Sequence, residues 1–155
     1  MQNQRELELA SVLIADDHFA VLESVVPMLK PFFNVVGTAS DGKAAVEAED
    51  RLHPDVVILD ISMPVMSGID AAKQMRKQGS KARIVFLTVH EDTDILAAAK
   101  AAGGKGYVVK SRLGTDLIPA IQDALAGKDF VSKFSPEEPR YGCFDSEQPC
   151  CSDCS

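Results

Sequence analysis

The chain has 155 residues, a length that predicts one compact domain with a sizeable hydrophobic core. Hydrophobic residues make up 46% of it, but no apolar run reaches the roughly 18 residues that a membrane span requires, which excludes an integral membrane protein. Sixteen Lys and Arg against 23 Asp and Glu give a formal charge of −7, which argues against broad contact with nucleic acid or anionic lipid. The first residues lack the basic region and cleavage site of a secretory signal, so we expect a cytoplasmic protein.

Apolar runs of strand length alternate with segments of helical periodicity, five times along the chain. The runs are rich in Val and Ile and lie within residues 12–15, 33–39, 56–59, 84–87 and 106–109. The helical stripes lie within residues 21–29, 44–52, 69–76, 95–102 and 117–125. Continuous apolar strands are typical of a sheet covered on both faces, so the alternation predicts an α/β domain with a parallel sheet between two helical layers.

The pattern also predicts the limits of the domain. We expect an N-terminal extension over residues 1–8, a folded domain over residues 9–132 and a flexible tail over residues 133–155, which is rich in Pro, Ser and acidic residues. Asp41-Gly42 and Ser67-Gly68 are predicted to open helices, and Gly79, Gly103-Gly104 and Gly127 to close them. Because too little sequence follows the last helix, we expect no DNA-binding domain in this chain.

Four of the five predicted strands end in polar residues that complement one another. Asp16-Asp17, Asp60, Thr88 and Lys110 each follow an apolar run. A single polar residue there commonly marks only the end of a buried strand, but the carboxyl ends of parallel strands share one edge, where ligands bind. Three carboxylates gathered there repel one another and favour a divalent cation, and oxygen ligands suit Mg²⁺. Together with the Lys110 ammonium and the Thr88 hydroxyl, these carboxylates provide the groups that phosphoryl transfer requires.

These residues resemble the receiver domain of bacterial two-component response regulators. The resemblance covers about residues 10–132 and rests on Asp16-Asp17-His18, DISMPVMSG (60–68), Leu87-Thr88 and GYVVK (106–110). GYVVK, together with FVS (130–132) after the last helix, is most similar to the NarL/FixJ-like subfamily. The resemblance implies a flavodoxin-like (βα)5 three-layer sandwich with a parallel five-stranded sheet of order 2-1-3-4-5.

The resemblance also implies a metal-dependent phosphate acceptor. Asp60 would accept a phosphoryl group from a sensor histidine kinase or phosphotransfer protein. Asp17 would bind Mg²⁺ directly and Asp16 through water, while Asp60 and the backbone carbonyl of Ser62 would complete the protein's share of the metal sphere. Lys110 would pair with a phosphoryl oxygen.

Thr88 and Tyr107 would then report phosphorylation, the hydroxyl turning toward the phosphate and the ring swinging inward. A domain of this kind assists its own phosphorylation and dephosphorylation and is otherwise no enzyme. We expect it to control a downstream partner by a conformational change and not to bind nucleic acid directly. The apolar stripes within residues 21–29 and 117–125 permit a homodimer, although core burial explains them equally well.

Three other features have alternative interpretations. Cys143, Cys150, Cys151 and Cys154 could bind Zn²⁺ or an iron–sulfur cluster, which would make the protein a metal or redox sensor, or they could belong to a reduced tail without a site. The chain could also be the truncated receiver of a DNA-binding transcription regulator. Residues 37–44 resemble a phosphate-binding loop but end in Ala44, which lacks the hydroxyl that such a loop uses for Mg²⁺. We interpret His18 and His53 as loop residues and not as ligands.

Overall fold

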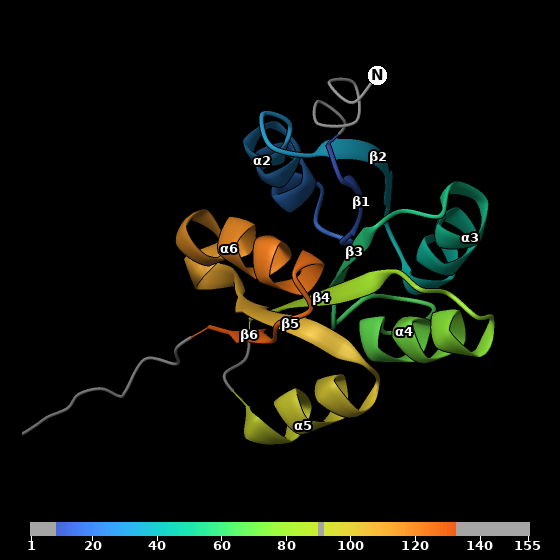
Figure 1. Ribbon diagram of the computed structural model, residues 1–155. Coiled ribbons are helices and arrows are strands. Elements are labelled where there is room, and N and C mark those ends of the chain that lie inside the picture. Colours follow the sequence, from blue (N-terminus) through green and yellow to red (C-terminus); the bar gives the residue numbers. More distant parts are fainter. Residues whose placement is uncertain (1–8, 90–91, 133–155) are drawn as a thin grey trace, which may run out of the picture.

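A single sheet of six parallel strands organises the part of the chain that the computed structural model describes, residues 9–89 and 92–132 (Figure 1). The strand order is β2-β1-β3-β4-β5-β6. The bounds are β1 (Ser11–Ala15), β2 (Asn34–Ala39), β3 (Val56–Asp60), β4 (Arg83–Thr88), β5 (Gly104–Val109) and β6 (Phe130–Val131). The expected order 2-1-3-4-5 is therefore confirmed, and one short strand is added beside β5. The predicted N-terminal extension and the cysteine-containing tail lie outside the described residues.

Five helices of the described region cover the two faces of this sheet. They are α2 (Phe19–Leu29), α3 (Gly42–Leu52), α4 (Gly68–Lys77), α5 (Thr93–Ala101) and α6 (Leu113–Leu125), and a short 3₁₀ turn, η1 (Lys110–Arg112), precedes α6. Figure 1 shows α2 and α6 together on one side of the sheet, with α3, α4 and α5 on the other. The three-layer arrangement expected from the sequence is thus observed.

Each strand contributes side chains to two separate cores, because successive residues of a strand point to opposite faces. In β1, Leu13 packs with the helices α3, α4 and α5, whereas Ile14 packs with α2 and α6. In β3 the same division separates Leu59 from Ile58. All four side chains are completely buried. This double burial explains why the strands are continuously apolar and do not alternate with polar residues.

The helix ends follow the predicted local chemistry. The Asp41 carboxylate caps α3 by accepting a hydrogen bond from the backbone N–H of Ala44 at 2.8 Å. The Ser67 hydroxyl caps α4 by accepting one from the N–H of Asp70 at 3.1 Å. Such caps satisfy N–H groups that have no partner within the helix. Gly79, after α4, has a φ of +86°, which suits a residue without a Cβ.

The sixth strand is held by a buried hydroxyl that connects it to β5 and α6. The N–H of Ser132 donates to the carbonyl of Tyr107 at 2.8 Å, and the Ser132 hydroxyl accepts from the N–H of Val109 at 3.2 Å. The same hydroxyl donates to Asp116 in α6 at 2.6 Å. Burial alone would raise the pKa of Asp116, but hydrogen bonds from Ser132, Arg112 and Thr115 outweigh it and lower the pKa.

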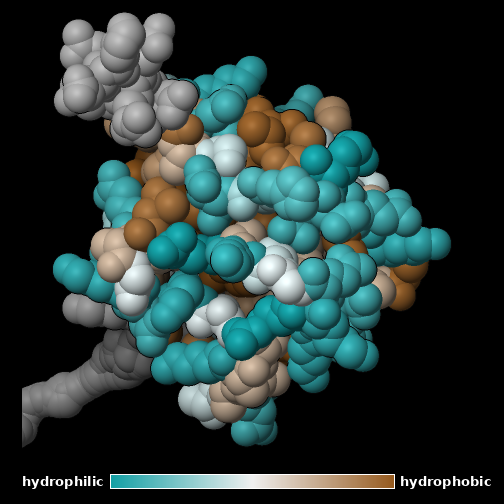
Figure 2. Space-filling model, turned by 45° about the vertical axis from the view of Figure 1, so that its right-hand side comes forward, coloured by the Kyte–Doolittle hydropathy of each residue, from teal (hydrophilic) through white to brown (hydrophobic). Residues whose placement is uncertain are grey.

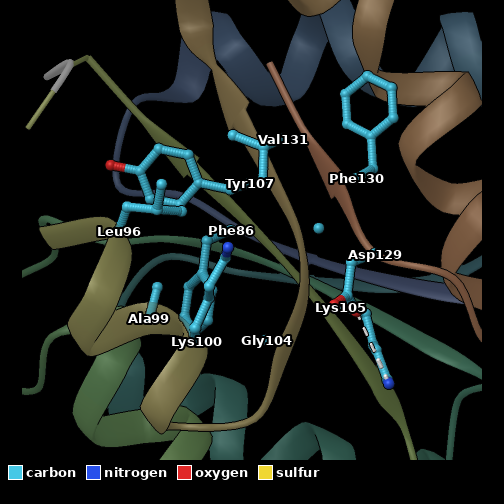
Figure 3. A pocket seen from close by; sticks show the side chains of 11 residues that line it. Phe86, Leu96, Ala99, Lys100, Gly104, Lys105, Tyr107, Asp129, Phe130 and Val131 are labelled. Carbon is cyan, nitrogen blue, oxygen red and sulfur yellow. Dashed lines mark ion pairs between the residues drawn. The ribbon is translucent and has the colours of Figure 1, made fainter. Parts of the chain in front are cut away.

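A small pocket lies between this strand, β5 and α5. Figure 3 shows Tyr107, Phe130 and Val131 at its wall, with an ion pair between Lys105 and Asp129 (3.7 Å) at one side. Because Tyr107 both lines the pocket and pairs with Val131 across the strands, the last described residues pack directly beside the ring.

The outer surface is largely hydrophilic on the face drawn in Figure 2, where hydrophobic residues form small separate patches. None of the helices in the described part of the chain combines the length and apolarity needed to traverse a bilayer. Among the described residues, the large apolar side chains that are more than half exposed are Phe19, Phe32, Val65 and Val89.

We predict that Ser132→Ala lowers the free energy of unfolding by about 1–3 kcal/mol, because it leaves the buried Asp116 carboxylate without its shortest hydrogen bond. Urea denaturation measures the change. Ser24→Ala is the matched control, since the Ser24 hydroxyl donates to the Ala20 carbonyl on an exposed helix face and its removal should cost less than about 0.5 kcal/mol. Equal stability of the two variants would contradict the role given to Ser132.

Candidate functional site

Four strand ends deliver polar side chains to one edge of the sheet. Asp16 directly follows β1, Asp60 is the last residue of β3, Thr88 is the last residue of β4, and Lys110 directly follows β5. Since β1, β3, β4 and β5 are parallel neighbours in this order, their carboxyl ends meet at the same edge. The residues singled out in the sequence therefore share one site.

The centre of the site is a lysine between two buried aspartates. The Lys110 Nζ lies 2.8 Å from an Oδ of Asp16 and 3.2 Å from an Oδ of Asp60. The side chains of Asp16 and Asp60 are 0% and 3% exposed, and that of Lys110 is 10% exposed. Water screens such contacts weakly, so the pKa of each group depends strongly on the charges of the other two.

Burial and the neighbouring charges both change the pKa values of Asp60 and Lys110. The pKa of Asp60 is raised to about 6, first by burial and then by the neighbouring Asp16 charge, while Lys110 lowers it in part. Burial alone would lower the pKa of Lys110, but its contacts with Asp16 and Asp60 outweigh this and raise the pKa. Lys110 therefore stays protonated. The surroundings of Asp60 still disfavour its ionised form, because Lys110 offsets only part of the effect of burial and of the Asp16 charge.

Asp17 and His18 complete the cluster from the turn after β1. An Oδ of Asp16 accepts the backbone N–H of His18 at 2.8 Å, a turn that short Asp side chains favour. It brings the His18 Nδ1 to 3.1 Å from Asp16 and 3.2 Å from Asp17. His18 is thus a loop residue, as expected, but it lies within the carboxylate cluster. In the sequence, the position of His18 directly after Asp16-Asp17 is the feature that indicates its closeness to these carboxylates.

The other residues of the sequence analysis have more varied positions. The backbone N–H of Ser62 donates to Asp60 at 3.3 Å, so Ser62 lies beside the Asp60 carboxylate. His53 caps the end of α3 before β3 begins, at the opposite edge of the sheet. The four cysteines lie outside the described residues.

Thr88 ends β4, the strand beside β3, and Tyr107 lies in the adjacent β5; both residues are 2% exposed. Burial raises the pKa of Tyr107, and a hydrogen bond with the Thr88 side chain acts in the opposite direction. The ring of Tyr107 is buried on the face of β5 that packs against α5. A contact between a strand-end hydroxyl and a buried ring connects the site to the pocket of Figure 3.

The loop after Asp60 contains an unusual turn. Val65 has a φ of +70°, and the N–H of Met66 donates to the carbonyl of Pro64 at 2.7 Å, which is the pattern of a γ-turn centred on Val65. A β-branched residue is strained at positive φ. Farther along, Gly68 approaches the end of β3 so closely that a Cβ would lie 2.3 Å from the Asp60 carbonyl oxygen.

The donor set fits a divalent cation. Asp16, Asp17, His18 and Asp60 each offer a ligand atom, and these atoms all lie within 4.8 Å of one another. Three carboxylates face one ammonium, which leaves two negative charges in excess. Carboxylate oxygens are the ligands that Mg²⁺ prefers, so the chemistry of the carboxylates is compatible with the Mg²⁺ expected from the sequence.

The comparisons with known proteins point to one family. Residues 12–122 match the family model described as response regulator receiver domain. The chain is 33% identical over 135 residues to the nitrate/nitrite response regulator protein NarL of Escherichia coli, an alignment that covers 86% of this chain and 61% of NarL. It is 40% identical over 116 residues to the transcriptional regulatory protein PdtaR of Mycobacterium tuberculosis, covering 74% of this chain and 56% of PdtaR. The chain therefore spans about three-fifths of the length of these relatives.

Solved structures give the same result. The signal receiver domain of the putative response regulator NarL from Mycobacterium tuberculosis has a TM-score of 0.74 and 33% identity, covering 78% of this chain and 99% of that one. A two-component response regulator of the LuxR family from Aurantimonas has a TM-score of 0.76 and 32% identity, covering 84% and 92%.

We predict that Asp60→Asn stabilises the metal-free protein near neutral pH. The pKa of Asp60 in the folded state, about 6, lies above its ordinary value of 3.8, so the folded state binds the proton more tightly and stability falls as pH rises from about 4 to 6. The variant should not show this fall and should be more stable at pH 7 by on the order of 2 kcal/mol, measured by urea denaturation in chelator. Asp70→Asn, at an exposed carboxylate of α4, should keep the wild-type pH profile. A parallel profile for Asp60→Asn would contradict the raised pKa.

We predict that Val65→Gly raises the free energy of unfolding by up to about 1 kcal/mol. Relief of strain at positive φ gains about 1–2 kcal/mol, and the added freedom of glycine in the unfolded chain offsets about 0.5–1 kcal/mol of this. Val65→Ala removes the exposed isopropyl group but keeps the Cβ, so it should remain near wild type. If alanine and glycine behave alike in thermal denaturation, the backbone at Val65 is not strained.

Proposed function

Since this chain belongs to the receiver domains of two-component response regulators, with NarL-type regulators among its relatives, we propose that Asp60 is its phosphate acceptor. The observation that carries the proposal is the Lys110 ammonium 3.2 Å from the Asp60 carboxylate, next to a buried Asp16. A carboxylate beside a fixed cation can act as a nucleophile toward phosphorus while the cation offsets the charge of the incoming group.

The proposed reaction transfers a phosphoryl group from a phosphohistidine of a sensor kinase or phosphotransfer protein. An Asp60 oxygen attacks phosphorus, the new O–P bond forms as the N–P bond breaks, and the departing imidazole keeps the electron pair and takes up a proton. Lys110 pairs with a phosphoryl oxygen. Hydrolysis of the acyl phosphate returns the chain to its first state, so it assists its own phosphorylation and dephosphorylation and no other reaction.

We propose that Asp17, Asp60 and the Ser62 carbonyl hold Mg²⁺ directly and that Asp16 assists through water. When bound, the ion supplies positive charge that offsets the oxygens of the transferring group. The exposure of the Asp17 side chain, 32% against 0% for Asp16, supports this division, because the accessible carboxylate is the one an ion can reach from solvent.

The proposed response passes through Thr88 and Tyr107. The Thr88 hydroxyl turns toward a phosphoryl group on Asp60 and leaves its contact with Tyr107, which changes the packing of the ring. Because the ring lines the pocket between α5, β5 and β6, the surface formed by these elements is the one that changes. A shift between two pre-existing conformations suffices for this response.

Membership of the receiver family also supports a proposal about where the domain works and with which partner. We propose that residues 9–132 form the receiver unit and that it works in the cytoplasm with a sensor kinase. A homodimer through α2 and α6 remains a prediction, and Val25, Leu29, Leu117 and Ile121 of these helices are already buried in the core. Absence of nucleic-acid binding also remains a prediction. The relatives NarL and PdtaR are named as regulators, PdtaR as a transcriptional one, and both are longer than this chain.

Labelling with acetyl phosphate and Mg²⁺ tests the acceptor. Wild-type protein should gain phosphoryl mass in intact-protein mass spectrometry, Asp60→Asn should gain none, and Lys110→Ala should label on the order of a hundredfold more slowly because the charge on the phosphoryl oxygens is no longer offset. Chelation of the metal should abolish labelling. Asp70→Asn controls for loss of a surface carboxylate and should label normally. A phosphoryl group on Asp60→Asn would place the acceptor elsewhere.

A further inference from the structure

The imidazole of His18 faces the carboxylates of the acceptor site. Its Nδ1 lies 3.1 Å from Asp16, 3.2 Å from Asp17 and 3.9 Å from Asp60. Ions bound at about 2.1 Å have neighbouring ligand atoms about 3.0 Å apart in an octahedral shell and about 3.4 Å apart in a tetrahedral one. The two shorter separations fall in this range, so the ring nitrogen is spaced from the aspartates as one ligand of a shared ion would be.

A cation of the protein itself already lies against this set of atoms. The Lys110 Nζ is 3.5 Å from the His18 Nδ1, while it also contacts Asp16 and Asp60. An ammonium group has only donors, whereas the neighbouring carboxylates have only acceptors, so the role of Nδ1 depends on the tautomer, and the ring protonated at Nε2 is the one that turns a lone pair to Lys110. In that tautomer the nitrogen can donate electrons to a positive ion next to the carboxylates.

The local structure holds the ring at this place without enclosing it. The backbone N–H of His18 is bound by Asp16, and His18 is the N-cap residue from which α2 begins. The side chain is nevertheless 60% exposed, so core packing does not account for its direction. Solvent has open access to the ring and to Asp17, which gives an incoming ion a path to both.

We propose that His18 is a ligand for borderline divalent ions of the first transition row, such as Zn²⁺ or Co²⁺, which bind together with Asp16 and Asp17 in place of Mg²⁺. Imidazole binds these ions well, whereas Mg²⁺ prefers oxygen. His18 thereby determines which ions the site accepts. This inference rests on the proposed function, since it uses the carboxylates of the same acceptor site.

Metal titration of the full chain with its four cysteines changed to serine tests the proposal, because the thiols would otherwise compete for Zn²⁺. Calorimetry gives the association constants for Zn²⁺ and Mg²⁺, and we expect His18→Ala to lower their ratio at least about tenfold. In ¹⁵N spectra of the imidazoles, Zn²⁺ should shift the His18 Nδ1 resonance and Mg²⁺ should not. His53→Asn is the matched control, since asparagine tolerates the left-handed backbone of this residue, and should leave ratio and shift unchanged.

The outcomes separate this inference from the proposed function. If Zn²⁺ binds but the ratio and the His18 resonance do not change, His18 is not a ligand, while Mg²⁺-dependent labelling of Asp60 still supports the acceptor. If neither ion binds and Asp60 is not labelled, the acceptor site itself is wrong and the inference falls with it.

Discussion

The site depends on one electrostatic constraint, the enclosure of the Lys110 ammonium between the buried carboxylates of Asp16 and Asp60. The lysine keeps two like charges together at an edge from which water is largely excluded, but it does not neutralise the cluster. The raised pKa of Asp60 expresses the remaining imbalance. A site of this kind is poised to take up more positive charge, and the proposed metal and the proposed phosphoryl transfer both follow from that deficit.

The sheet makes the constraint possible. Asp16, Asp60 and Lys110 are distant in sequence, and they meet because β1, β3, β4 and β5 are parallel and end at the same edge. The completely buried strands give the site a rigid base, since Leu13, Ile14, Ile58 and Leu59 are packed on both faces. The polar residues can then be held at short distances by backbone that has little freedom to relax.

The sequence predicted the features that depend on local pattern. Valine-rich runs marked the buried strands, and Asp41 and Ser67 marked helix starts, because capping needs a side-chain acceptor within a few residues. Features that depend on distant partners were missed. The strand β6 has two residues and no periodicity, and it exists through the contact of Ser132 with Asp116. Nothing in the sequence indicated that Val65 takes a positive φ, a conformation for which glycine is the usual signal.

The attachment of β6 to β5 connects the strand ends of the site to the last described residues of the chain. The backbone of Ser132 is bound to the carbonyl of Tyr107, and its hydroxyl to the amide of Val109. Ser132 is therefore held at two points of β5, the carbonyl of Tyr107 and the amide of Val109, which directly precedes Lys110. A movement of β5 would therefore reach Ser132 directly, through two hydrogen bonds and without an intervening element.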